Sequence, residues 1–292
     1  MELKQHRTFS PRQVGQALGV SESSIKRWCD KGKMSFRKTA GGHRRLALYG
    51  ILDFIRKNDF DLVLPEILGL PSTVGSGPRL IDQARRLFTD AIENGNEDQC
   101  LSIILDMRLA GYDIAEISDS LIAPSFYELG DRWRHEELEI YQERRGVEVM
   151  RSVLLRLKDT LIPAAPTAPL AIGATFEDDP YSLAGLLAEL VLLEMGWQAR
   201  FLGSELPSDT IAQAVQDINP RMLWLSVSTL TDTEDFICKY RRLYDICLSQ
   251  RCAVVLGGRA ISESIRQQIQ YASFGDNLKH LRAFAKSQYL VE

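Results

Sequence analysis

The chain has 292 residues, of which 45% are hydrophobic and 25% charged, a composition typical of globular proteins and not of disordered, fibrous or coiled-coil ones. This length predicts two or three domains. The N-terminus is polar, and the most apolar stretch, residues 183–195, is short and contains Gly185, Glu189 and Glu194, so we expect no signal peptide and no membrane span. The five cysteines include no CxxC pair, which indicates a cytoplasmic protein without a disulfide framework or a structural zinc site.

The net charge of −4 conceals a strong asymmetry. Residues 1–57 contain 13 Lys and Arg against four acidic residues, a net charge of +9, which leaves −13 on the rest of the chain. A basic segment joined to an acidic body is typical of a small nucleic-acid-binding module attached to a regulatory or catalytic body. We therefore expect duplex DNA as a partner of the N-terminal segment.

Residues 8–31 predict two helices joined by a tight turn, Gly19-Val20-Ser21. Gly19 permits the bend, and the Ser21 hydroxyl can cap the second, basic helix. Basic side chains of that helix would project toward a DNA groove. The expected DNA contacts here are Ser21, Lys26, Arg27 and Trp28.

Residues 33–46, with the sequence KMSFRKTAGGHRRL, predict a strand, a Gly41-Gly42 turn and a returning strand. Guanidinium groups beside glycines can approach phosphates closely. The segments KRWCDKGKM and RKTAGGHRR resemble the MerR superfamily, in particular its excisionase-like members, over about the first 57 residues. This resemblance implies a winged helix-turn-helix DNA-binding domain over residues 1–68, and a basic patch without a nucleic-acid role is the alternative. The expected contacts of the wing are Lys38, His43, Arg44 and Arg45.

Two stretches rich in Pro, Gly or small residues, 69–78 and 163–169, predict linkers that divide the chain into three pieces. The middle piece, residues 79–162, has apolar residues at helical spacing, with turn signals at 94–96 and 110–111, and predicts a four-helix bundle. The stripes are Leu80, Ala84, Leu87 and Ala91; Leu101, Ile104, Leu105 and Leu109; and Val147, Met150, Val153, Leu154, Leu157 and Leu161.

The last piece, residues 170–292, alternates short apolar runs with helical patterns and predicts a Rossmann-like, doubly wound parallel sheet whose ligand edge lies at the strand C-termini. The chain as a whole is thus expected to be a multidomain α and α/β protein. The expected strands are 170–174, 198–202, 222–226 and 253–256, and the expected helices are 182–195, 208–216, 232–248, one from Ile261 and 277–287.

Within the middle piece, the run Leu129-Gly130-Asp131-Arg132-Trp133, with Glu143 ten residues after the Trp, resembles the helical half of cobalamin-binding regulators and methyltransferases. The resemblance implies that Trp133 covers the upper face of a corrin and that Glu143 lies nearby. That family usually has Glu-His at the second position, and its light-sensing members have a His after the Trp, whereas here Arg144 and Arg134 follow. A place for Trp133 in the core of the bundle is the alternative.

In the last piece, three elements resemble the cobalamin-binding pattern DxHxxG, SxL and GG, and small residues at strand ends would leave space for a nucleotide tail. The alignment places Pro180 and Ser182 at the Asp and His positions, so the imidazole that ligates cobalt from below is absent, and a hydroxyl is a poor replacement. No other histidine is an obvious substitute. The implied cofactor-binding residues are Trp133, Glu143, Ser182, Gly185, Ser228, Thr229, Leu230, Gly257 and Gly258.

The acidic run Glu177-Asp178-Asp179 is more typical of a solvated loop or a helix N-terminus than of a metal site, and no nucleophile-base set, P-loop or paired-carboxylate site indicates an enzyme. We therefore expect a DNA-binding transcriptional regulator whose cobalamin-binding-like module controls homo-oligomerisation. It would lack the standard His-ligated cobalamin and bind another ligand or none. The alternatives are a corrinoid-binding methyl-transfer component, a true cobalamin- or light-dependent repressor, and a purely structural body.

Overall fold

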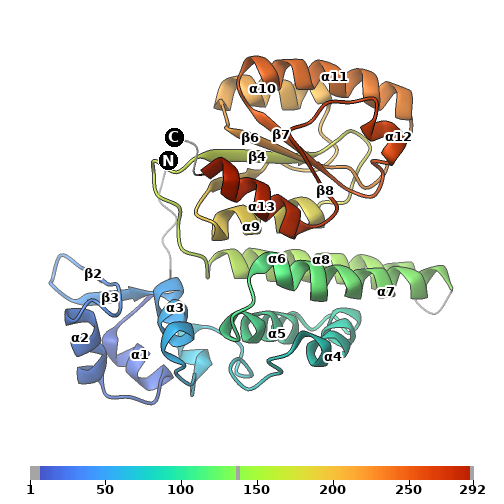
Figure 1. Ribbon diagram of the computed structural model, residues 1–292. Coiled ribbons are helices and arrows are strands. Elements are labelled where there is room, and N and C mark those ends of the chain that lie inside the picture. Colours follow the sequence, from blue (N-terminus) through green and yellow to red (C-terminus); the bar gives the residue numbers. More distant parts are fainter. Residues whose placement is uncertain (1–6, 136–138, 290–292) are drawn as a thin grey trace. The chain divides into compact units, whose positions relative to one another are not determined.

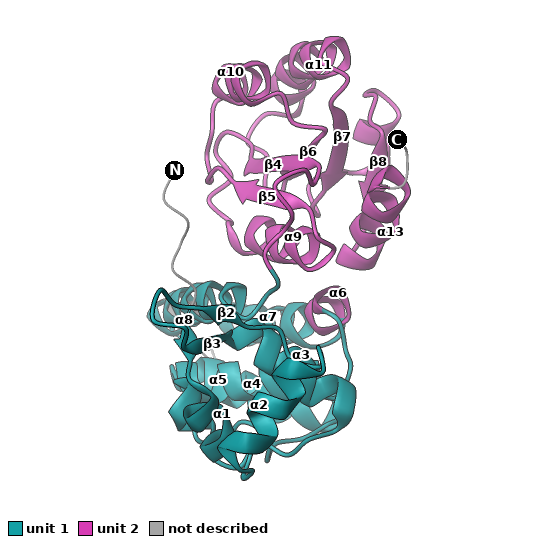
Figure 2. Ribbon diagram, turned by 90° about the vertical axis from the view of Figure 1, so that its left-hand side faces the viewer, with its two compact units in different colours: residues 1–113, 120–162 teal, residues 114–119, 163–292 magenta. Residues whose placement is uncertain are grey.

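The computed structural model describes residues 7–135 and 139–289 (Figure 1). It divides the chain into two compact units (Figure 2). The first comprises residues 1–113 and 120–162, and the second comprises residues 114–119 and 163–292. Among the described helices, none is long and apolar enough to cross a bilayer.

The first unit begins with a small antiparallel sheet and two short helices, of which the first packs on both the second helix and the sheet. Ser10 and Gln13 form a capping box at the start of the first helix, and the Ser21 hydroxyl accepts a hydrogen bond from the Ser24 N–H at 3.2 Å at the start of the second. The sheet has the order β1-β3-β2. The elements are β1 (Thr8–Phe9), α1 (Pro11–Ala17), α2 (Glu22–Asp30), β2 (Arg37–Lys38), β3 (Arg44–Ala47), α3 (Leu48–Asn58) and the 3-10 helix η1 (Pro65–Leu68).

Residues 69–78, predicted as a linker, pack against the next part of the same unit. Val74 is buried, and the Thr73 hydroxyl lies 2.7 Å from the Ser102 hydroxyl. The Asp106 carboxylate accepts hydrogen bonds from the backbone N–H groups of Gly75 at 2.6 Å and Gly77 at 3.0 Å. The N-terminal module and the following helices therefore form one compact unit.

Four helices of this unit form its remaining core: α4 (Ile81–Glu93), α5 (Glu97–Leu109), α7 (Ala123–Arg134) and α8 (Ile140–Lys158). The predicted stripe on α4 is wrong in part, because Leu80 and Leu87 are exposed. Phe88 and Ile92 are buried in their place, since they lie on the same helix face as Ala84 and together remove more apolar surface from water. The predicted stripes on α5 and α8 are largely buried.

The second unit has a parallel five-stranded sheet with the order β5-β4-β6-β7-β8, which confirms the predicted doubly wound arrangement. Helices α9 and α13 cover one face, and α10 and α11 cover the other. The strand β8 was not predicted, and the helix expected from Ile261 is a single turn, α12. The bounds are β4 (Leu170–Thr175), α9 (Leu183–Glu194), β5 (Gln198–Phe201), α10 (Ser208–Ile218), β6 (Met222–Ser226), α11 (Thr233–Ser249), β7 (Ala253–Gly257), α12 (Glu263–Arg266), β8 (Ser273–Gly275) and α13 (Leu278–Tyr289).

A short segment from the middle of the chain belongs to this second unit. It contains α6 (Ile114–Ile117), whose first N–H donates to the Glu194 carboxylate at 2.8 Å. The Asp119 carboxylate in turn accepts hydrogen bonds from the backbone N–H groups of Leu278 at 2.9 Å and Lys279 at 3.0 Å, at the start of α13. Carboxylates satisfy otherwise unpaired N–H groups at helix N-termini, so these three hydrogen bonds anchor the segment. A π-helical turn, Ser118–Ile122, connects it to α7.

Candidate nucleic-acid interface and cofactor site

Helix α2 buries one face and exposes a basic one. Ile25 and Cys29 are buried, whereas Arg27 is exposed and Lys26 forms an exposed ion pair with Glu22 at 2.7 Å. Trp28 was predicted as a DNA contact, but its ring packs against two aromatic rings, with centroid distances of 4.9 Å to Phe54 and 5.0 Å to Phe60. This packing leaves Trp28 half-buried, and its contact with DNA stays a prediction.

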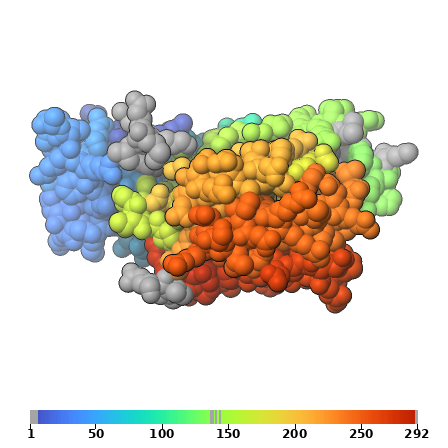
Figure 3. Space-filling model, turned by 90° about the horizontal axis from the view of Figure 1, so that it is seen from above, coloured from blue at the N-terminus to red at the C-terminus, as the bar shows by residue number. Residues whose placement is uncertain are grey.

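The strands β2 and β3 and the turn between them form a hairpin, residues 37–47, whose tip is well defined by hydrogen bonds. The N–H of Gly42 donates to the Thr39 carbonyl at 2.9 Å, and the N–H of His43 donates to the Thr39 hydroxyl at 3.2 Å. Gly42 has a φ of 79°, which favours glycine. This basic segment lies at the surface of its unit (Figure 3, blue), and Lys38, His43 and Arg45 are exposed.

Arg44 differs from the other predicted contacts of the hairpin. Its guanidinium lies 2.5 Å from the Asp30 carboxylate and 5.3 Å from the centre of the Phe36 ring. Arg44 and Arg45 look alike in sequence, and no local pattern indicates the partner Asp30, because it lies 14 residues from Arg44.

In the helical part, Trp133 lies in the last turn of α7 with 44% of its surface exposed, so the alternative of a core residue is wrong. The preceding Arg132 donates two hydrogen bonds to the Glu93 carboxylate, at 2.7 and 3.1 Å, which join this turn to α4. The side chain of Glu143 lies outside the described part of the structure. The expected proximity of Glu143 to Trp133 therefore stays a prediction.

In the sheet unit, the glycines of the cobalamin-binding pattern permit close internal packing. A Cβ on Gly185 would lie 2.2 Å from the Phe201 ring, and one on Gly258 would lie 2.2 Å from the Val227 carbonyl oxygen. Gly257 has the Gly275 carbonyl 3.2 Å from its Cβ position. Leu230 packs against the α10 and α11 side of the core. Internal packing therefore leaves no room for a side chain at Gly185 or Gly258.

The polar residues at this edge of the sheet bind a carboxylate of the same chain. Asp179 is fully buried and accepts hydrogen bonds from the backbone N–H groups of Ser228 at 2.6 Å and Tyr181 at 3.1 Å, and from that of Thr229. Burial raises the pKa of Asp179, and these three hydrogen bonds oppose the rise. The expectation of a solvated loop is wrong for Asp179, because the loop after β6 needs a buried acceptor for its N–H groups.

The two acidic residues before Asp179, Glu177 and Asp178, have different surroundings. Glu177 pairs with Lys239 at 2.7 Å and accepts a hydrogen bond from the Ser208 N–H at 2.9 Å, so the pKa of Glu177 is lowered, first by the Lys239 ammonium. Asp178 is exposed with a φ of 59°. Over the described residues, no group of three His, Cys, Asp or Glu side chains could hold a metal ion.

The residues at this edge do not fit a corrinoid held through an imidazole. Such a ligand would need a histidine at position 182 and an open slot next to Gly185 and Ser228. In the structure, Ser182 is the N-cap of α9, and the Phe201 ring packs against Gly185. The Asp179 carboxylate accepts a hydrogen bond from the N–H of Ser228.

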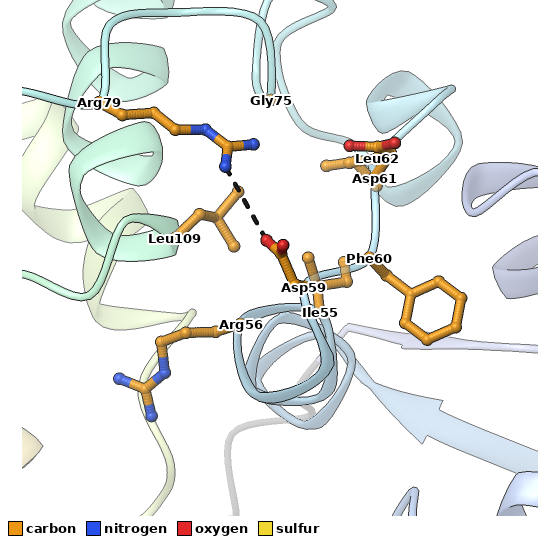
Figure 4. A pocket seen from close by; sticks show the side chains of 9 residues that line it. All are labelled: Ile55, Arg56, Asp59, Phe60, Asp61, Leu62, Gly75, Arg79 and Leu109. Atoms are coloured by element: carbon orange, nitrogen blue, oxygen red, sulfur yellow. Dashed lines mark ion pairs between the residues drawn. The ribbon is translucent and has the colours of Figure 1, made fainter.

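A small hollow in the first unit is lined mainly by residues around the end of α3 and by Arg79 (Figure 4). Both arginines that line it have acidic partners within the protein. Arg79 lies 3.9 Å from Asp59, and Arg56 lies 2.9 Å from Asp53. This hollow contains none of the predicted site residues.

Comparison with known proteins finds similar proteins for both the helical part and the sheet. A family model described as a B12 binding domain matches residues 84–158. The fold is similar to that of the monomethylamine corrinoid protein from Methanosarcina barkeri, with a TM-score of 0.60, 18% identity, and coverage of 71% of this chain and 99% of that one. A cobalamin-binding protein from Desulfitobacterium hafniense gives a TM-score of 0.37 at 21% identity, over 69% of this chain and 96% of that one.

One curated relative is a regulator. The chain is 28% identical over 162 residues to the HTH-type transcriptional repressor CarH of Myxococcus xanthus. The match covers 55% of this chain and 52% of CarH, so the chain matches about half the length of this relative. A match to the model of a B12 binding domain, a Rossmann-like parallel sheet and similarity to a transcriptional repressor are therefore found in the same chain.

Proposed function

We propose that the protein is a transcriptional regulator that binds duplex DNA through a winged helix-turn-helix domain, residues 1–68. The observation that carries the proposal is the exposed basic surface formed by α2 and the β2–β3 hairpin within a segment of net charge +9. In this arrangement Lys26 and Arg27 face the bases, and Lys38, His43 and Arg45 face the phosphates. The similarity to CarH, named as an HTH-type transcriptional repressor, supports this function.

The remainder of the chain is acidic and acts as the regulatory body, with a helical bundle over residues 79–162 and a Rossmann-like domain over residues 170–292. Its net charge of −13 makes it an unfavourable partner for DNA. One winged module covers roughly 600–1,000 Å² of surface, so specific binding requires paired modules on repeated half-sites. The body therefore brings copies of the chain together.

This body works without a histidine-ligated corrinoid, since Ser182 stands where the resemblance places the histidine and the Asp179 carboxylate accepts the N–H of Ser228. DNA binding is then controlled by another ligand of this body or by its self-association alone. A methyl-transfer role is less well supported, because that chemistry needs cobalt in a controlled ligand field. The protein is thus proposed to be a regulator and not an enzyme.

The test uses the full-length protein and fluorescent duplex DNA of mixed sequence in anisotropy titrations at several salt concentrations. We expect binding that weakens steeply with salt, with about 0.9 units of log-log slope for each phosphate contact. Arg45→Ala is expected to weaken binding to all sequences alike, whereas Arg27→Ala also relaxes the preference for a selected operator. Binding that is absent or independent of salt would refute the proposed function. Sedimentation with and without DNA tests self-association, and a strictly monomeric protein would refute that part.

A further inference from the structure

The hairpin is joined to the end of helix α2 by one side chain. The Arg44 guanidinium on β3 lies 2.5 Å from the carboxylate of Asp30, the last residue of α2. Its side chain is only 26% exposed and lies over the Phe36 ring at 5.3 Å. Such a guanidinium has lost much of its freedom to reach an external phosphate, because it already has an anionic partner.

The opposite face of the hairpin carries a different pair of arginines. In the β2–β3 register, Arg37 lies directly opposite Arg45, and Lys38 lies opposite Arg44. Residues directly opposite in an antiparallel pair project from the same face, and like charges placed there are destabilising. Arg37 and Arg45 are both exposed, and neither has an ion pair among the described residues. An anion that bridges the two guanidinium groups would remove this repulsion.

We infer that Arg44 is a positioning residue, which fixes the hairpin against α2 through Asp30, and that Arg37 and Arg45 are the pair that contacts the DNA phosphates. This inference rests on the proposed function and deepens it. It also explains an acid at the end of a basic helix: Asp30 would repel DNA if it were free, but the Arg44 guanidinium neutralises it. The hairpin and α2 then approach the duplex as one rigid surface.

The decisive variant is Asp30→Asn in the full-length protein, titrated with mixed-sequence duplex DNA. This change makes the DNA-binding module more positive by one charge, so electrostatics alone predicts tighter binding. The positioning role predicts the opposite sign, because the hairpin loses its attachment and its phosphate contacts. We expect binding two- to fivefold weaker, the size of one surface ion pair, together with a smaller salt slope.

Asp53→Asn is the matched control. Asp53 lies on α3 and pairs with Arg56 at 2.9 Å and Lys57 at 2.7 Å, so the substitution makes the same charge change away from the hairpin. We expect equal or slightly tighter binding for this variant. Asp30→Glu keeps the charge and is expected to bind within twofold of the parent, and Arg45→Ala is expected to lower the salt slope by about one unit.

Amide hydrogen exchange at Thr39 and His43 gives a second readout that does not involve DNA. We expect faster exchange there in Asp30→Asn and not in Asp53→Asn, with unchanged exchange in the core of α3. If the parent binds DNA and the two Asn variants bind equally tightly, with the same exchange, the inference is overturned while the proposed function stands. If the parent itself does not bind DNA, the proposed function fails.

Discussion

Asp106 provides a direct test of the attachment between the N-terminal module and the helical core. Its side chain is 3% exposed, and its two oxygens accept the backbone N–H groups of Gly75 and Gly77. The substitution Asp106→Ala removes both acceptors, and a hydrogen bond to a charged group contributes about 1.5–3 kcal/mol. Two effects make the loss of stability smaller than the sum of the two hydrogen bonds. The buried carboxylate is itself costly, and the exposed Gly75 can donate to water instead. We expect a net loss of roughly 2–3 kcal/mol in the free energy of unfolding of this unit.

The assay is urea unfolding of the full chain combined with amide exchange at Gly75 and Gly77. Asp98→Ala is the matched control, because Asp98 lies on the same helix but is exposed and pairs with Arg156 at 2.7 Å. Asp98→Ala should lower the free energy of unfolding by less than about 1 kcal/mol. If Asp106→Ala unfolded at the same urea concentration as Asp98→Ala, with unchanged exchange at Gly75, the attachment through Asp106 would be refuted.

The same residue predicts a pH dependence. Burial raises the pKa of Asp106 above its ordinary value, and the Gly75 and Gly77 N–H groups partly oppose that rise. Between the ordinary pKa and the raised one, the folded chain binds more protons than the unfolded chain. The contribution of Asp106 to stability is therefore full below the ordinary Asp pKa and is lost as the pH rises through the raised value. The difference in stability between the parent and Asp106→Asn should change with pH in this window and be constant above it.

Three further predictions concern the sheet unit. Asp179→Ala leaves the N–H groups of the loop after β6 without an acceptor and should destabilise the protein by about 2–4 kcal/mol in urea unfolding, so an unchanged midpoint would contradict its buried role. Gly185→Ala forces the Phe201 ring to move and should cost about 1–3 kcal/mol, which a Gly185→Ala protein of parental stability would disprove. In titrations with adenosylcobalamin, first in the dark and then under light, we expect weak or absent binding and DNA binding that does not respond to either. Ser182→His tests whether the imidazole alone is missing. Tight, stoichiometric and light-sensitive binding by the parent would overturn this expectation.

Local pattern was sufficient for most of the elements. The alternation of apolar runs with helical spacing predicted β4 to β7 and the helices between them, because a buried parallel sheet requires continuous apolar strands. Ser21 was predicted as a cap, and the structure places it there, since capping depends only on the next three residues. By contrast, β8 has only three residues and no apolar run, so no periodic pattern indicates it.

The features that sequence could not predict depend on contacts between distant residues. The partner of Arg44, the buried position of Asp179 and the packing of residues 69–78 on Asp106 all depend on which groups the fold brings together. In each case a charged or flexible residue type suggests solvent exposure. A buried carboxylate is predictable only when the N–H groups that need an acceptor are known.

The segment 114–119 limits where the chain can be divided into independent parts. It is part of the sheet unit although residues of the helical unit flank it on both sides. A gene fragment that ends at residue 162 would carry α6 without Glu194, and one that begins at residue 163 would leave the first N–H groups of α13 without Asp119. Recombination at a single point between these units would thus damage both products. A boundary after residue 162 therefore separates each of these carboxylates from the N–H groups that it accepts.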